Sequence, residues 1–170
     1  MLKWMGAALL AAAAIWAGRY CSQSVTLRRR ALEAMVEMTG RAEDEIRFSG
    51  IDVCTLVGRL SRTDLGRTLP FLQPCARMCG GGAPFPDAWQ KALDQTGREM
   101  RLTEEDLDQL ASFGARLGAT DLEGQLAHCR LHGREFARLL EQAREQERTK
   151  GKLYRSLSLL ASAAVAILAI

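Results

Sequence analysis

Two pairs of metal-ligating side chains have the spacing of one helical turn. Cys75 and Cys79 form a C-x3-C pair, and His128 and His132 form an H-x3-H pair. Thiolate and imidazole are the ligands that tetrahedral zinc prefers, so these four side chains are candidates for a metal- or redox-sensing site. The same spacing also fits an apolar helix stripe in which free cysteines pack as small hydrophobic residues. A sensing site is therefore the alternative to simple packing.

No arrangement of residues in the sequence indicates catalysis. The segment from His128 to His132 lacks the glutamate that a zinc-protease helix carries between its two histidines. The glycine triplet at residues 80–82 is not followed by the lysine and Ser/Thr of a phosphate-binding P-loop. No combination of Ser, His and Asp stands out for acyl transfer. The sequence predicts a protein that is not an enzyme and has no cofactor.

The composition predicts an all-α protein. The chain of 170 residues contains 25 Leu and 25 Ala but only 5 Val and 5 Ile, and this excess of helix formers over β-branched residues argues against a large sheet. The formal net charge is +3, from 23 basic and 20 acidic residues, which is too even a mixture for a nucleic-acid-binding protein.

Charge is absent from two stretches, WMGAALLAAAAIWAG at residues 4–18 and SLSLLASAAVAILAI at residues 156–170. With their flanking residues they predict transmembrane helices at residues 1–20 and 153–170. Basic residues flank both segments on the side of the central region, which places that region in the cytoplasm. There the five cysteines should stay reduced. The N-terminal stretch also resembles a secretory signal peptide, and its cleavage would yield an exported helical adaptor instead.

Between these segments, residues 28–152 predict a cytosolic helical bundle. Apolar periodicity and Gly/Pro breaks predict helices at residues 28–48, 52–60, 68–78, 87–95 and 103–117. A loop is expected at residues 80–86. Thr103 is the expected N-cap of the helix at residues 103–117. A capping box at residues 120–123 opens a last, long helix that we expect to continue into the C-terminal segment. Its apolar residues recur as a heptad stripe: Leu122, Leu126, Cys129, Gly133, Phe136, Leu140 and Ala143.

Residues 113–128 contain the pattern F-G-x-x-L-G-x-x-D-x-x-x-Q-x-x-H. This pattern resembles the signature of the stage III sporulation protein AB family. The E-I-x-F element at residues 45–48 and the Ala88-Trp89 pair are similar to two further elements of that family. The order of the motifs and the length of the chain agree as well, so the resemblance covers essentially the whole sequence.

The resemblance implies a role in endospore formation, in the mother-cell part of the channel complex that links mother cell and forespore. The resemblance also implies that the soluble region is similar to the cytoplasmic domain of the platform protein (F protein) of type II secretion and type IV pilus machines. Such platforms are not enzymes. The implied location is the mother-cell (engulfing) membrane, with the soluble domain in the cytoplasm. The implied partners are the lipid bilayer, a cytosolic secretion-type ATPase (stage III sporulation protein AA), other membrane proteins of the channel and further copies of the chain.

The motif residues also have physical interpretations of their own. Leu117 and Gly118 followed by Asp121 suit a tight interhelical turn, with positive φ at the glycine and the carboxylate at the positive end of the next helix. We therefore assign turn and packing roles to Phe113, Gly114, Leu117, Gly118 and Asp121, and a core position to Trp89. Next to the heptad stripe lies a second stripe of candidate partner-binding residues, which are Gln125, His128 and His132.

Overall fold

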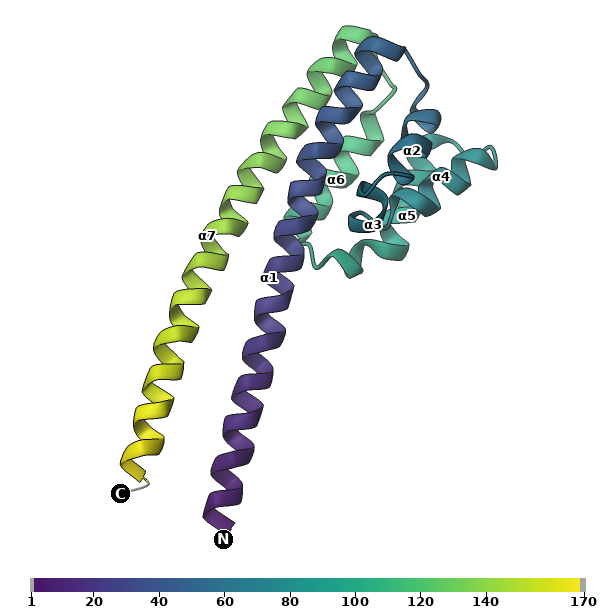
Figure 1. Ribbon diagram of the computed structural model, residues 1–170. Coiled ribbons are helices and arrows are strands. Elements are labelled where there is room, and N and C mark those ends of the chain that lie inside the picture. Colours follow the sequence, from purple (N-terminus) through teal and green to yellow (C-terminus); the bar gives the residue numbers. More distant parts are fainter. Residues whose placement is uncertain (1, 169–170) are drawn as a thin grey trace.

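Two long helices form the frame of the molecule. In the computed structural model, which describes the backbone of residues 2–168 and the side chains of residues 24–149, α1 (Leu2–Ser49) and α7 (Leu122–Leu168) lie side by side and antiparallel (Figure 1). No strand occurs among residues 2–168, which confirms the predicted all-α helical bundle. The last helix continues without a break into the C-terminal segment, as expected.

Shorter helices fill the chain between the two long ones and pack on one side of the pair (Figure 1). Neighbouring helices contact one another in the order α2 to α4, α4 to α5, α5 to α6 and α6 to α7. The bounds are α2 Val53–Ser61, α3 Leu65–Thr68, α4 Leu72–Gly80, α5 Phe85–Thr96, the 3-10 helix η1 Gly97–Met100, and α6 Glu104–Arg116.

One predicted helix is wrong. Residues 68–78 do not form a single helix, because α3 ends at Thr68 and α4 starts at Leu72. The break falls at Leu69, which has φ −113° and ψ 80° and precedes Pro70. A proline ring clashes with the backbone of the residue before it when that residue is helical, so the helix stops there. The first helix also differs from the prediction, since α1 begins at Leu2 rather than near Arg28.

Polar caps fix where the helices begin. The side chain of Asp52 accepts a hydrogen bond from the Thr55 amide at the start of α2, and Thr103 forms a capping box with Asp106 at the start of α6. At the start of α7 the cap is Asp121, whose Oδ1 accepts from the Gly124 amide at 3.0 Å. The cap is thus Asp121 rather than the Thr120 predicted to open a capping box, and Gly124, three positions after Asp121, has no side chain with which to complete a box.

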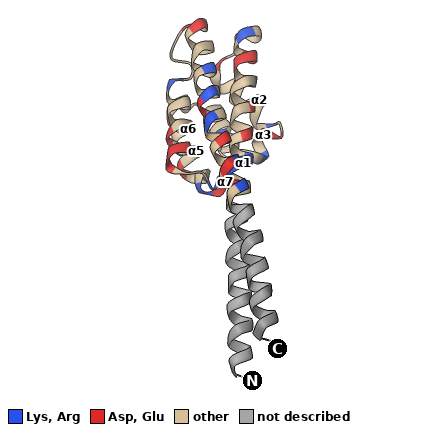
Figure 2. Cartoon of the chain, turned by 90° about the vertical axis from the view of Figure 1, so that its left-hand side faces the viewer, with Lys and Arg blue, Asp and Glu red and all other residues tan. Residues whose placement is uncertain are grey.

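The core lies between the frame and the short helices. Large buried side chains from α1 and α7 meet those of the short helices, and the set includes Leu32, Met35, Met38, Leu56, Phe71, Leu72, Trp89, Leu110, Phe113, Phe136 and Leu139. On α7 the stripe residues Cys129, Phe136, Leu140 and Ala143 are buried and Gly133 is half-buried, whereas Leu122 in the first turn is half exposed. Acidic and basic residues are spread along the helices of the described bundle (Figure 2), and most of them are exposed.

Within residues 24–149 we find no helix with a stretch long and apolar enough to cross a membrane. The transmembrane helices predicted at residues 1–20 and 153–170 lie outside the residues whose side chains are described.

Candidate functional site

The motif at residues 113–128 connects the end of α6 to the start of α7, and we call residues 113–128 the corner. Leu117 is buried directly after the last residue of α6, and Gly118 follows with φ 83°. An L-amino acid with a side chain is strained at this φ, and a Cβ atom on Gly118 would also lie 2.5 Å from Val53 Cγ2. The turn therefore requires glycine for its backbone shape and for its contact with α2.

Gly114 provides the space for Trp89. The indole is 1% exposed, and its Nε1 donates a hydrogen bond to the Leu110 carbonyl at 3.0 Å. The ring packs edge-on against Phe71 at a centroid distance of 4.8 Å and lies 5.9 Å from Phe113. A Cβ atom at position 114 would lie 2.3 Å from Trp89 Cδ1, so only glycine lets α6 approach the ring this closely.

His128 connects the start of α7 to the end of α6. Its ring is stacked on Phe113, with centroids 5.3 Å apart and planes 2° from parallel. Its Nε2 lies 2.9 Å from the Phe113 carbonyl oxygen, which is one of the last four carbonyls of α6 and has no partner within the helix. Because a carbonyl can only accept, Nε2 carries the proton in this contact. His128 thus acts as a C-terminal cap for α6.

Asp121 and Gln125 complete the corner. Asp121 caps α7, and the Gln125 side-chain amide donates to the Thr120 carbonyl at 3.0 Å. Every residue of the signature that we assigned to turn and packing, together with Gln125 and His128, therefore makes a contact within the chain. The side chains of Gln125 and His128 are half-buried, so their polar atoms are largely committed to the corner itself.

His132 lies deeper in the same stripe. It is 6% exposed, its ring centroid is 4.5 Å from that of His128, and its Nδ1 is buried without a hydrogen-bond partner. Burial, and secondarily the charges of His128 and Arg116, lowers the pKa of His132 to about 4. His132 is therefore neutral at pH 7 and forms part of the core beside Phe113 and Phe136.

This depressed pKa predicts acid sensitivity. Below the ordinary pKa of 6.5 the unfolded chain protonates His132, while the folded chain does not do so until about pH 4. The contribution of neutral His132 to the free energy of unfolding is therefore complete above pH 6.5 and is lost as the pH falls toward 4. At about 1.4 kcal/mol per pH unit, the free energy of unfolding falls by about 3 kcal/mol over this range. Urea denaturation at pH 7, 5.5 and 4 measures this loss. His132→Gln should flatten the pH dependence; an unchanged slope in that variant would assign it to other groups.

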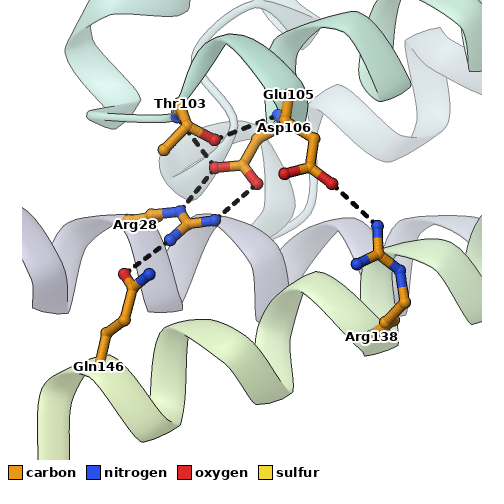
Figure 3. A network of polar contacts seen from close by, with 6 residues as sticks. All are labelled: Arg28, Thr103, Glu105, Asp106, Arg138 and Gln146. Atoms are coloured by element: carbon orange, nitrogen blue, oxygen red, sulfur yellow. Dashed lines mark hydrogen bonds and ion pairs between the residues drawn. The ribbon is translucent and has the colours of Figure 1, made fainter. Parts of the chain in front are cut away.

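A buried ion pair holds the opposite end of α6. Asp106 is 0% exposed and receives two hydrogen bonds from Arg28 of α1, from Nε to Oδ2 at 2.6 Å and from Nη2 to Oδ1 at 2.9 Å (Figure 3). The third guanidinium nitrogen, Nη1, donates to Gln146 Oε1 of α7 at 3.0 Å. The Thr103 amide donates to Asp106 Oδ2 at 2.9 Å. We call these four residues the clamp, because they join α1, α6 and α7.

The clamp is charged at neutral pH. Burial by itself would raise the pKa of Asp106, but the hydrogen bonds from Arg28 and Thr103 outweigh burial and hold the pKa below its ordinary value. The hydrogen bond to Asp106 likewise raises the pKa of Arg28. Nothing in the sequence pointed to this pair. Arg28 was one of the basic residues beside the first apolar segment, Asp106 was one of three acidic residues in the first turn of a helix, and 78 positions separate them.

The cysteine and histidine pairs do not come together as a metal quartet. Cys75 and Cys79 lie on α4 next to Cys54, whereas both histidines lie on α7 beside Phe113. Across residues 24–149 no three His, Cys, Asp or Glu side chains are placed to hold a metal ion. Burial raises the pKa of Cys75 to about 11 and also raises that of Cys79, so both thiols are protonated at neutral pH.

Comparison with known proteins identifies the family. Neither the curated proteins nor the solved structures contain a match to the chain. The family model described as stage III sporulation protein AB matches residues 3–170, which is nearly the entire sequence and includes the corner and both residues of the buried ion pair. The chain therefore belongs to the stage III sporulation protein AB family.

Proposed function

We propose that the chain is a non-enzymatic membrane platform of the channel or secretion complex between mother cell and forespore in endospore formation. In this role the helical bundle lies in the cytoplasm and couples a cytosolic secretion-type ATPase, stage III sporulation protein AA, to membrane partners. Membership of the stage III sporulation protein AB family supports the sporulation role. The coupling role extends that membership, by analogy with the platform proteins of secretion and pilus machines.

The proposed anchors are the two uncharged segments at residues 4–18 and 156–170. They belong to α1 and α7, and because these helices are antiparallel their free ends point in the same direction (Figure 1). A chain with this geometry can insert both segments into one bilayer and hold the bundle on one side of it. The basic residues that flank both segments favour the cytoplasmic side.

The observation that carries the proposal is the continuous helical connection between the bundle and these segments. Each of α1 and α7 continues from the core toward its apolar segment as a single helix. The clamp ties both of them to α6 through the contacts of Arg28 with Asp106 and Gln146. A force applied by a partner to the short helices would therefore reach both long helices together, as a mechanical coupler requires.

Co-purification tests the partner. The full-length chain, extracted from membranes with mild detergent, is expected to retain the companion ATPase. Gln125→Ala and His128→Ala are expected to lower the thermal stability of the chain, because these side chains form hydrogen bonds within the corner. Each variant should still retain the ATPase at a temperature at which it is folded. Loss of the ATPase from a folded variant would instead assign these residues to partner binding. Failure of the wild-type chain to retain the ATPase would contradict the coupling role.

Labelling tests the location. Ser112 is an exposed residue of α6. A Ser112→Cys variant, made in a background with Cys21→Ser and Cys54→Ser, is expected to resist a membrane-impermeant maleimide in intact cells and to react after the cells are permeabilised. The matched background chain without the new cysteine gives the level of reaction of the buried thiols. Reaction of Ser112→Cys in intact cells would place the bundle outside the cytoplasm and contradict the proposal.

A further inference from the structure

A small pocket with two arginines in its lining opens at the end of the bundle where α1 leaves the core toward its N-terminus. It has a volume of about 290 Å³ and lies between α1, the α3 segment and η1. Figure 2 shows both basic and acidic residues at this lower end of the described bundle. We call it the basal pocket, and its lining includes Leu27, Arg30, Arg67, Pro70, Glu99 and Met100.

The arginines of this pocket differ from their neighbours in their partners. Arg28 and Arg29 are both engaged by carboxylates, the first by Asp106 and the second by Glu33 and Glu147. Arg30, the next residue, is exposed and makes no ion pair with any residue in the range 24–149. It is therefore available to a ligand.

Arg67 is the second available cation of the pocket. Its side chain is 88% exposed, and its one carboxylate contact is with Asp64 at 3.9 Å, near the outer limit of an ion pair. Glu99 provides one opposing negative charge, so the pocket presents two guanidinium groups against one carboxylate. Two guanidinium groups on separate elements suit a phosphate, which accepts paired hydrogen bonds from each.

The position of the pocket specifies the source of that phosphate. Because α1 is a single helix, Arg30 lies about 15 Å along its axis beyond residue 20, the end of the proposed membrane segment, and its side chain leans back toward the N-terminus and the bilayer. The head-group layer is about 6 Å thick, so the pocket lies within about a Debye length of the bilayer surface. Leu27 is 43% exposed beside the arginines, which adds an apolar contact for the lipid.

We propose that the basal pocket binds the phosphate head group of an anionic phospholipid of the membrane that carries the terminal segments. The inference rests on the membrane attachment proposed above. Arg30 and Arg67 hold the phosphate, and Glu99 weakens this binding. Such a contact fixes the tilt and rotation of the bundle relative to the bilayer, because Arg30 belongs to the frame and Arg67 to the short helices.

The test is a titration of the full-length chain in detergent micelles with short-chain phosphatidylglycerol, followed by native mass spectrometry. One lipid is expected to bind in preference to phosphatidylcholine of the same chain length. Arg30→Gln and Arg67→Gln should each weaken binding about tenfold, as expected for the loss of a charge-assisted contact. Glu99→Gln should strengthen binding. The control is Arg134→Gln, which removes an exposed arginine of α7 that lies in a different groove.

Three results would overturn the inference. Equal binding of phosphatidylglycerol and phosphatidylcholine would show that the pocket does not select an anion. Equal weakening by Arg134→Gln would show a general charge effect. Inorganic phosphate that displaces the lipid at the same concentration would show a site for a soluble anion.

A flotation assay with neutral phosphatidylcholine vesicles separates this inference from the proposed function. Wild type and Arg30→Gln should float alike, because the terminal segments provide the attachment. If neither floats, the membrane attachment fails and the inference fails with it. If both float and the titration shows no selectivity, the head-group site alone is refuted.

Discussion

Replacing Asp106 by alanine is expected to lower the free energy of unfolding by about 4 kcal/mol. The substitution leaves the Arg28 guanidinium buried without its carboxylate, and the low exposure of this residue gives water little access to compensate. It also removes the carboxylate that accepts from the Thr103 amide, so the capping box of α6 is lost. Urea denaturation of the full-length chain at pH 7 measures the effect.

The adjacent residue is the matched control. Glu105 likewise forms an ion pair with an arginine, in this case Arg138 of α7, whose Nη2 lies 2.9 Å from Glu105 Oε1 (Figure 3). Both of these side chains are about half exposed. Water screens such a pair, so Glu105→Ala should change stability far less than Asp106→Ala. The double variant Arg28→Met with Asp106→Leu should recover much of the loss, because it leaves no buried charge. Equal effects of Asp106→Ala and Glu105→Ala would contradict the assignment of the clamp.

Local signals in the sequence were sufficient to predict most helix boundaries. The position of Thr103 before an acidic turn predicts a cap, and the place of Gly118 after Leu117 predicts a turn residue. Both effects depend on a few neighbouring residues and need no knowledge of the fold. The break at Leu69 is also a local effect, caused by Pro70, and the apolar periodicity of residues 68–78 does not indicate it.

Contacts between distant segments could not be predicted in the same way. The spacing of His128 and His132 indicated a shared helix face, but it did not show that this face packs on Phe113. Likewise, no periodicity relates Arg28 to Asp106, since their meeting depends on how α6 is placed against the frame. In the folded chain Asp106, at the start of α6, and Arg28, beside the first apolar segment, form one buried ion pair. This pair is visible only in the packed structure.

The close approach of Gly114 to Trp89 gives the second prediction. Gly114→Ala is expected to lower the free energy of unfolding by about 4 kcal/mol. An added Cβ would lie 2.3 to 2.4 Å from three atoms of the Trp89 ring. The ring is fully surrounded by the core and cannot move aside without overpacking Phe71 or Phe113, which costs about 1–3 kcal/mol. Its displacement also breaks the hydrogen bond from Trp89 Nε1 to Leu110, at a further cost of about 1–3 kcal/mol.

A second glycine separates this steric effect from helix propensity. Gly40 lies within α1, and a Cβ atom there would have no neighbour within 4 Å. Gly40→Ala should therefore stabilise the chain by up to about 1 kcal/mol, because alanine is the better helix former and meets no obstacle. The two substitutions are chemically identical, so opposite signs in urea denaturation, accompanied by a change in Trp89 fluorescence in Gly114→Ala alone, would attribute the loss to the indole. If both variants were stabilised to the same degree, α6 would not pack against Trp89 as closely as described.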